Sequence, residues 1–146
     1  MITEQIQPTG VLNVTLKKSD GTIKEEHQFT NIVVSSGKDF IASRMIGTSS
    51  PVMSKMAVGD SNTSLDVGNT SLASELARTD LKSSAVESNV VTYAADFLNG
   101  VGTGGIVEAG IFDNTTPGVM LCRTTFPVIN KEADDILTIN WNVTIN

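Results

Sequence analysis

The C-terminal run of the chain carries the pattern that most restricts its fold. From Leu137 onward, apolar and polar residues alternate in the sequence ILTINWNVTIN, which spans Ile136 to Asn146. Because successive side chains of a β-strand point to opposite faces, this alternation predicts a strand with one buried face. We therefore expect Trp141, Ile139 and Val143 to lie in the core of a sheet.

Similar extended segments recur along the chain and are separated by turn residues. Residues 11–16 and 22–34 flank Ser19-Asp20-Gly21, which predicts a hairpin because glycine accepts the positive φ angles of tight turns. Further strands are expected over residues 53–58, 85–98, 106–112 and 119–126, with a polar connection over 127–135. Short strands separated by turns favour an antiparallel β-sandwich or jelly-roll-like fold over an α/β fold.

One or two short helices are expected beside these strands. Ser35 or Ser36 can cap the free N–H groups of a first helix, which Gly47 would end. Its apolar stripe would consist of Phe40, Ile41, Met45 and Ile46. Residues 72–77, LASELA, resemble one or two further helical turns. The fold class predicted is therefore all-β, antiparallel, with one or two short helices.

The length of the chain and its polar beginning suggest a simple domain organisation. At 146 residues, one domain is expected, with residues 11–146 forming a single β-sandwich domain. Residues 1–10 are polar and contain Pro8, so they are either an extended arm or a disordered end. If they form an arm that binds a partner, its contact residues would be Met1, Ile2, Ile6 and Pro8.

Charge and cysteine content restrict the partners that we expect. The net charge of −6 argues against direct binding of nucleic acid or of an anionic membrane. The single cysteine, Cys122, excludes an intrachain disulfide, so the chain is expected to be able to fold in a reducing cytosol. We expect no secretory signal and no membrane span, because the first residues lack a basic start with an apolar core and no apolar run is long enough.

Several segments resemble chemical motifs but lack the structural context that those motifs require. Gly100, Gly102 and Gly105 spell G-x-G-x-x-G, but a strand rather than a helix is expected to follow them. Residues 60–64 resemble the start of a calcium loop that lacks its central glycine and closing glutamate. The only histidine, His27, and Cys122 have no obvious catalytic or metal-binding partners. We therefore expect no catalytic, cofactor or metal site, and no enzyme.

Glu108 and Arg123 are predicted to form a cross-strand ion pair. They lie on the two strands that flank the turn cluster at residues 113–118. A symmetric hairpin about that cluster places Phe112 opposite Val119 and Glu108 opposite Arg123. Such a buried carboxylate can also resemble a catalytic group, but no second acid or base lies nearby in the sequence, so a structural role is expected.

Several motifs, read together, resemble a group of small virion structural proteins of tailed bacteriophages. In that group a VGxG/D loop, a TLxxELAR segment, an xEAGLF strand and an ARTxFPxIxKxxxDxLTIxWxI ending recur in this order. The segments that carry the resemblance here are KMAVGDSNTSL (Lys55–Leu65), SELAR (Ser74–Arg78), VVTYAADF (Val90–Phe97), GIVEAGIFD (Gly105–Asp113) and MLCRTTFPVINKEADDILTINWNV (Met120–Val143). The resemblance covers roughly residues 53–143 and leaves residues 1–52 uncovered.

The resemblance implies a β domain that binds other virion proteins and catalyses no reaction. The first expectation is a capsid decoration (cement) protein, which binds the outer shell and bridges major capsid subunits, usually as a dimer or trimer. An N-terminal arm could add to an exposed strand edge of a neighbour. The alternatives are a tail, baseplate or fibre-attachment component and, from a third class, a module that binds host-surface carbohydrate.

Overall fold

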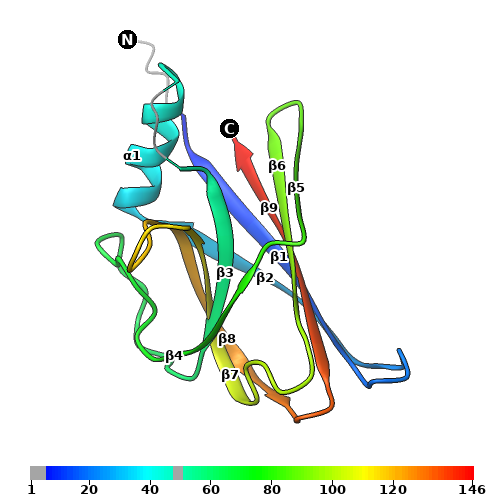
Figure 1. The fold of residues 1–146 in the computed structure, drawn as a ribbon. Helices are drawn as coiled ribbons and strands as arrows, with labels where there is room; N and C mark the ends of the chain where they lie inside the picture. Colours follow the sequence, from blue (N-terminus) through cyan, green and yellow to red (C-terminus); the bar gives the residue numbers. More distant parts are fainter. Residues whose placement is uncertain (1–5, 48–50) are drawn as a thin grey trace.

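The computed structural model describes residues 6–47 and 51–146, and its strands form a single antiparallel sheet. The nine strands are arranged in the order β4-β3-β7-β8-β2-β1-β9-β6-β5 (Figure 1). The strands are β1 (Pro8–Lys17), β2 (Ile23–Val33), β3 (Met53–Gly59), β4 (Glu75–Asp80), β5 (Ser83–Glu87), β6 (Val90–Phe97), β7 (Gly104–Asp113), β8 (Met120–Lys131) and β9 (Ile136–Ile145), and helix α1 (Ser35–Arg44) follows β2. The predicted all-β, antiparallel class is confirmed, with one helix in the described residues.

The sheet curls into a half-barrel, and β2 joins its two halves. Most of β2 pairs with β1, whereas its last residues, Ile32 and Val33, pair with Arg123 and Cys122 of β8. One core on the concave side collects buried residues from both halves, such as Trp141 from β9 and Ile111 from β7. The core is thus shared as in a sandwich, although the two facing halves belong to one continuous sheet.

The alternation seen in the C-terminal sequence matches the strand register. Trp141 lies opposite Leu12 of β1 on one side and opposite Tyr93 of β6 on the other. Ile139 lies likewise between Val14 and Ala95. Trp141, Ile139 and Val143 are all buried, so the core prediction for these residues is confirmed.

Helix α1 packs on β8 through a glycine. A Cβ atom on Gly37 would lie 2.0 Å from the carbonyl oxygen of Leu121, so only glycine allows this close approach. The Ser36 hydroxyl donates a hydrogen bond to the Met120 carbonyl at 2.7 Å. The predicted serine cap is wrong: the N-cap residue is Val34, with no side-chain hydrogen bond. Ser36 is used to attach the helix to the sheet instead.

Three predicted elements differ from the structure. Residues 72–77 do not form a helix, because Glu75–Asp80 is the edge strand β4 paired with β3. The expected strand over 85–98 is a hairpin of β5 and β6, with Ser88 at positive φ in its turn. Strand β8 continues to Lys131, so residues 127–131 of the expected connection are extended, and residues 129–131 pair with β7.

Part of the segment 1–10, predicted as an arm or a disordered end, belongs to the sheet. Strand β1 begins at Pro8, which pairs with Ile145, so residues 8–10 belong to the sheet. Gln7 exchanges backbone hydrogen bonds with Asn146, both at 3.2 Å. Ile6 is exposed, whereas Met1 and Ile2 lie outside the described residues.

The turns at the opposite end of the sheet are joined by an ion pair. Lys24 Nζ lies 2.8 Å from Oδ2 of Asp135, and the same oxygen accepts a hydrogen bond from the backbone N–H of Glu132 at 2.9 Å. The Lys24 hydrogen bond and then the Glu132 N–H lower the pKa of Asp135 below its ordinary value of 3.8. The carboxylate is therefore favoured in the folded state.

The ion pair between Lys24 and Asp135 should contribute to the stability of the fold in a way that depends on pH. Because the pKa of Asp135 is lower in the folded chain, the contribution is present above the ordinary value of 3.8 and is lost as pH falls through the lower folded value. We expect Asp135→Asn to destabilise the protein at neutral pH and to reduce the loss of stability on acidification. Urea unfolding measured from neutral pH down to strongly acidic pH would check this, and an unchanged acid limb would contradict it.

Candidate functional site

The predicted ion pair between Glu108 and Arg123 is present and fully buried. Arg123 Nη2 lies 2.8 Å from Glu108 Oε2, and Nε donates to the same oxygen at 3.2 Å. The prediction that the two residues lie directly opposite each other is wrong, because Glu108 faces Thr125 and Arg123 faces Gly110. Irregularities on both sides of this stretch of the β7–β8 ladder shift the register, so the pair forms diagonally.

Both charged groups also bind the loop between β3 and β4. Glu108 accepts hydrogen bonds from the backbone N–H groups of Ala73 and Ser74, at 3.0 and 2.7 Å. Arg123 donates to the Thr63 carbonyl at 3.1 Å and to Asn69 Oδ1 at 3.1 Å. The segment that resembled the start of a calcium loop, residues 60–64, thus supplies the Thr63 carbonyl as an acceptor for the Arg123 guanidinium. The pair acts as a clamp that holds the loop at residues 60–74 on the sheet.

The other groups considered for chemistry lie apart from this clamp. His27 is exposed on β2, where its ring stacks on Phe29 and Nε2 lies 3.3 Å from a Glu25 oxygen. Cys122 is buried, and burial raises the pKa of its thiol. Burial likewise raises the pKa of the Tyr93 hydroxyl to about 12. Among residues 6–47 and 51–146, no cluster of three potential metal ligands occurs.

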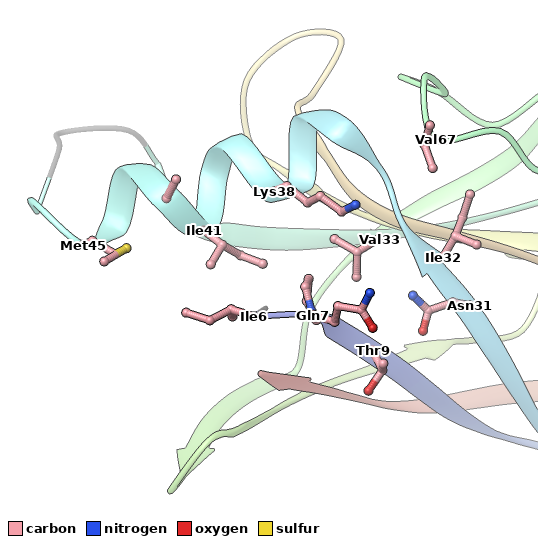
Figure 2. Close-up of a pocket in the computed structure, with 12 residues that line it drawn as sticks. Ile6, Gln7, Thr9, Asn31, Ile32, Val33, Lys38, Ile41, Met45 and Val67 are labelled. Atoms are coloured by element: carbon pink, nitrogen blue, oxygen red, sulfur yellow. The ribbon is translucent and has the colours of Figure 1, made fainter. Parts of the chain in front are cut away.

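An apolar groove lies beneath helix α1 (Figure 2). Its volume is about 490 Å³, and it is bounded by α1, the start of β1 and the end of β2. The apolar lining comes from Ile6, Ile32, Val33, Ile41, Met45 and Val67. Four polar residues also line it: Lys38 from the helix, Asn31 from β2, and Gln7 and Thr9 from the start of the chain. The Asn31 Nδ2 group is buried without a hydrogen-bond partner, while its Oδ1 accepts from Trp141 Nε1 at 3.0 Å.

A second apolar groove lies on the other side of the same helix. Its volume is about 610 Å³, and Ile41 of α1 lines both grooves. The rest of its wall comes from α1, from the segment that enters β3, and from β5, β6 and β9, through residues such as Phe40, Val52, Val86, Tyr93 and Val143.

Together the two grooves make one end of the half-barrel strongly apolar. We call this surface the apolar end and define it by its exposed residues Ile6, Met45, Ile46, Val52 and Val86. Met45 and Ile46 are 82% and 83% exposed, so the prediction that they belong to the buried stripe of the helix is wrong. They follow the last residue of α1, beyond the part of the helix that packs on β8. Exposed apolar surface of this kind marks contact sites for other molecules.

The fold and the apolar end define an all-β protein with a surface suited to binding a partner. None of the known family models, curated proteins or solved structures compared with the chain matches it. The helix in the described part of the chain is too short to cross a bilayer.

Proposed function

We propose that this chain is a structural protein of a tailed-phage particle, most specifically a capsid decoration protein. It would bind the outer shell and bridge neighbouring major capsid subunits. The proposal rests on the ordered motifs between residues 53 and 143 and on the apolar end. In the fold these motifs supply strands β3, β4, β6, β7, β8 and β9 with the loop clamped by Glu108 and Arg123, so they specify a scaffold.

The apolar end is the observation that carries a binding role. A monomer that leaves Met45, Ile46 and Val86 in water gives up the free energy that their burial would provide, about 1.5–3 kcal/mol for each side chain. A partner that covers this end recovers it. Shell proteins offer such partners in many copies, and a protein that binds only the assembled shell stabilises it by mass action.

The aromatic residues favour this role over carbohydrate binding. Sugar sites generally present exposed aromatic rings, but Trp141, Phe97 and Phe112 are completely buried here. Phe126 and Tyr93 are also buried, while Phe29 and Phe40 are partly buried and pack on the core. The apolar end is lined mainly by aliphatic side chains, as expected for a contact with protein.

Copy number in purified particles tests the proposed function. A decoration protein is expected in many copies, in a fixed ratio to the major capsid protein, as measured by quantitative mass spectrometry. A few copies for each particle, located at the tail in an electron-microscopy map, would replace decoration with the alternative tail role. Complete absence from purified particles would overturn the virion role itself.

The variant Met45→Lys tests the apolar end as the contact surface. We expect binding to particles that lack the protein to weaken by about tenfold or more, because a charge replaces a buried apolar side chain at the contact. A positive charge near the C-terminus of α1 is compatible with the helix dipole, so the fold should persist. Val128→Lys, at an exposed valine on β8, is the matched control. Equal binding by both variants would exclude the apolar end.

A further inference from the structure

The two edge strands of the sheet differ in how they are protected. Strand β4 carries two ion pairs, Arg78 with Glu75 at 2.8 Å and Lys55 of β3 with Asp80. Arg78 also lies over the Phe112 ring and donates to the Pro117 carbonyl at 2.7 Å. Charged side chains along an edge discourage another strand from pairing with it. Pairing of a strand from another chain with the β4 edge is therefore disfavoured.

Strand β5 forms the opposite edge and has no such protection. All five of its residues are exposed, and its register with β6 is regular from Ser83 to Glu87. The sequence SSAVE contains no proline and no lysine, and its one charge lies at the end. Val86 is 71% exposed. A regular, exposed edge strand presents unpaired N–H and C=O groups that can pair with a strand of another chain.

We propose that β5 pairs antiparallel with β5 of a second copy of this chain, about a two-fold axis at Ala85. This register places Ser83 opposite Glu87, Ser84 opposite Val86, and Ala85 opposite itself. No two like charges face each other, so the strand is complementary to its own copy, as a two-fold interface requires. A closed pair of this kind is a dimer and not a trimer.

The apolar face of the hairpin continues across the proposed interface. Val86 lies opposite Val91 of β6, which lies opposite Val143 of β9, so these three valines share the concave face. Directly paired residues across the new ladder also share a face, so Val86 of each copy enters the same surface as Ser84 of the other. The second apolar groove, lined by Ser84, Ala85 and Val86, then meets its counterpart. The interface would therefore include the surface of the two grooves in addition to the five residues of each β5 strand.

This pairing can be tested separately from the proposed virion role, because it concerns the isolated protein; of the apolar end it uses Val86, whereas the particle-binding test uses Met45. Analytical ultracentrifugation over a wide concentration range should show a dimer. Val86→Lys should raise the dissociation constant by about tenfold or more, because it places a charge in the apolar part of the ladder. Val128→Lys, away from this edge, should leave the dimer unchanged. A wild-type protein that stays monomeric throughout the range would overturn the proposal.

Cysteine cross-linking tests the register directly. Directly opposed Cα atoms in antiparallel strands lie about 4.5–5.5 Å apart, within the range for a disulfide. Ala85→Cys should therefore form a disulfide-linked dimer under mild oxidation, whereas Ser83→Cys, which faces Glu87, should not. The native Cys122 is buried and should not compete. Equal cross-linking of both variants would exclude this register.

A deletion tests whether the β5 edge binds the N-terminal segment of the other copy instead of its β5 strand. Removing residues 1–5 leaves β1 and β5 intact and should leave the dimer unchanged. If the deletion abolished the dimer, the N-terminal segment of the other copy would be the strand that binds, and pairing between two β5 strands would be excluded.

Discussion

Replacing Arg123 with methionine should lower the free energy of unfolding by about 3–5 kcal/mol, the cost of breaking a buried ion pair by removing one partner. Without the guanidinium, the Glu108 carboxylate stays in the core with only the N–H groups of Ala73 and Ser74. The Thr63 carbonyl loses its donor as well. Chemical unfolding followed by circular dichroism would measure the loss.

The double variant Arg123→Met, Glu108→Gln separates the ion pair from the rest of the clamp. We expect it to lose less stability than the sum of the two single variants, because no unpaired buried charge remains. Lys82→Met is the control, since Lys82 pairs with Asp96 on the surface and such pairs contribute about 0–1 kcal/mol. A loss for Arg123→Met as small as that of the control would contradict the clamp.

Trp141→Ala should also cost about 3–5 kcal/mol, as expected for removing a fully buried aromatic side chain. Trp141 lies between Leu12 and Tyr93 in the central row of the core. Its Nε1–H is also the donor to Asn31 Oδ1, and the Asn31 Nδ2 group already has no partner. The alanine variant would therefore leave both polar atoms of the Asn31 amide unpaired.

Trp141→Phe separates packing from the hydrogen bond. It keeps most of the apolar volume and removes the donor, so we expect a smaller loss, about 1–3 kcal/mol. Circular dichroism is the suitable signal, because Trp141 is the only tryptophan and its fluorescence is absent from both variants. An alanine variant as stable as the phenylalanine variant would show that this position is not closely packed.

The all-β class and the core of β9 could be predicted because they depend on local sequence. Strict alternation from Leu137 to Ile145 has one explanation in a folded chain, and Trp141, Ile139 and Val143 are buried as it requires. The ion pair between Glu108 and Arg123 was predictable because a short turn cluster brings their strands together. Its diagonal geometry was not, because the bulges that shift the register leave no clear mark in the sequence.

The errors occur where tertiary contacts override local preference. Residues 72–77 have helical propensity, but Glu108 binds the N–H groups of Ala73 and Ser74 and β3 offers an edge to the following residues. Met45 and Ile46 fit a helical stripe, yet they follow Arg44, the last residue of α1, and both are exposed. The apolar end itself could not be read from the sequence, since its residues lie before β1, after α1, before β3 and on β5, which are far apart in the chain.

The hydrogen bonds between Gln7 and Asn146 have a practical consequence for protein engineering. A few linking residues could join these positions and turn β9 and β1 into a hairpin, with new ends opened at the exposed turn at Asp20 and Gly21. A peptide or reporter attached at the new ends would project from the side of the molecule opposite the apolar end. The same fusion attached after Asn146 would lie beside the surface that we propose binds a partner, because Ile145 lines the second groove.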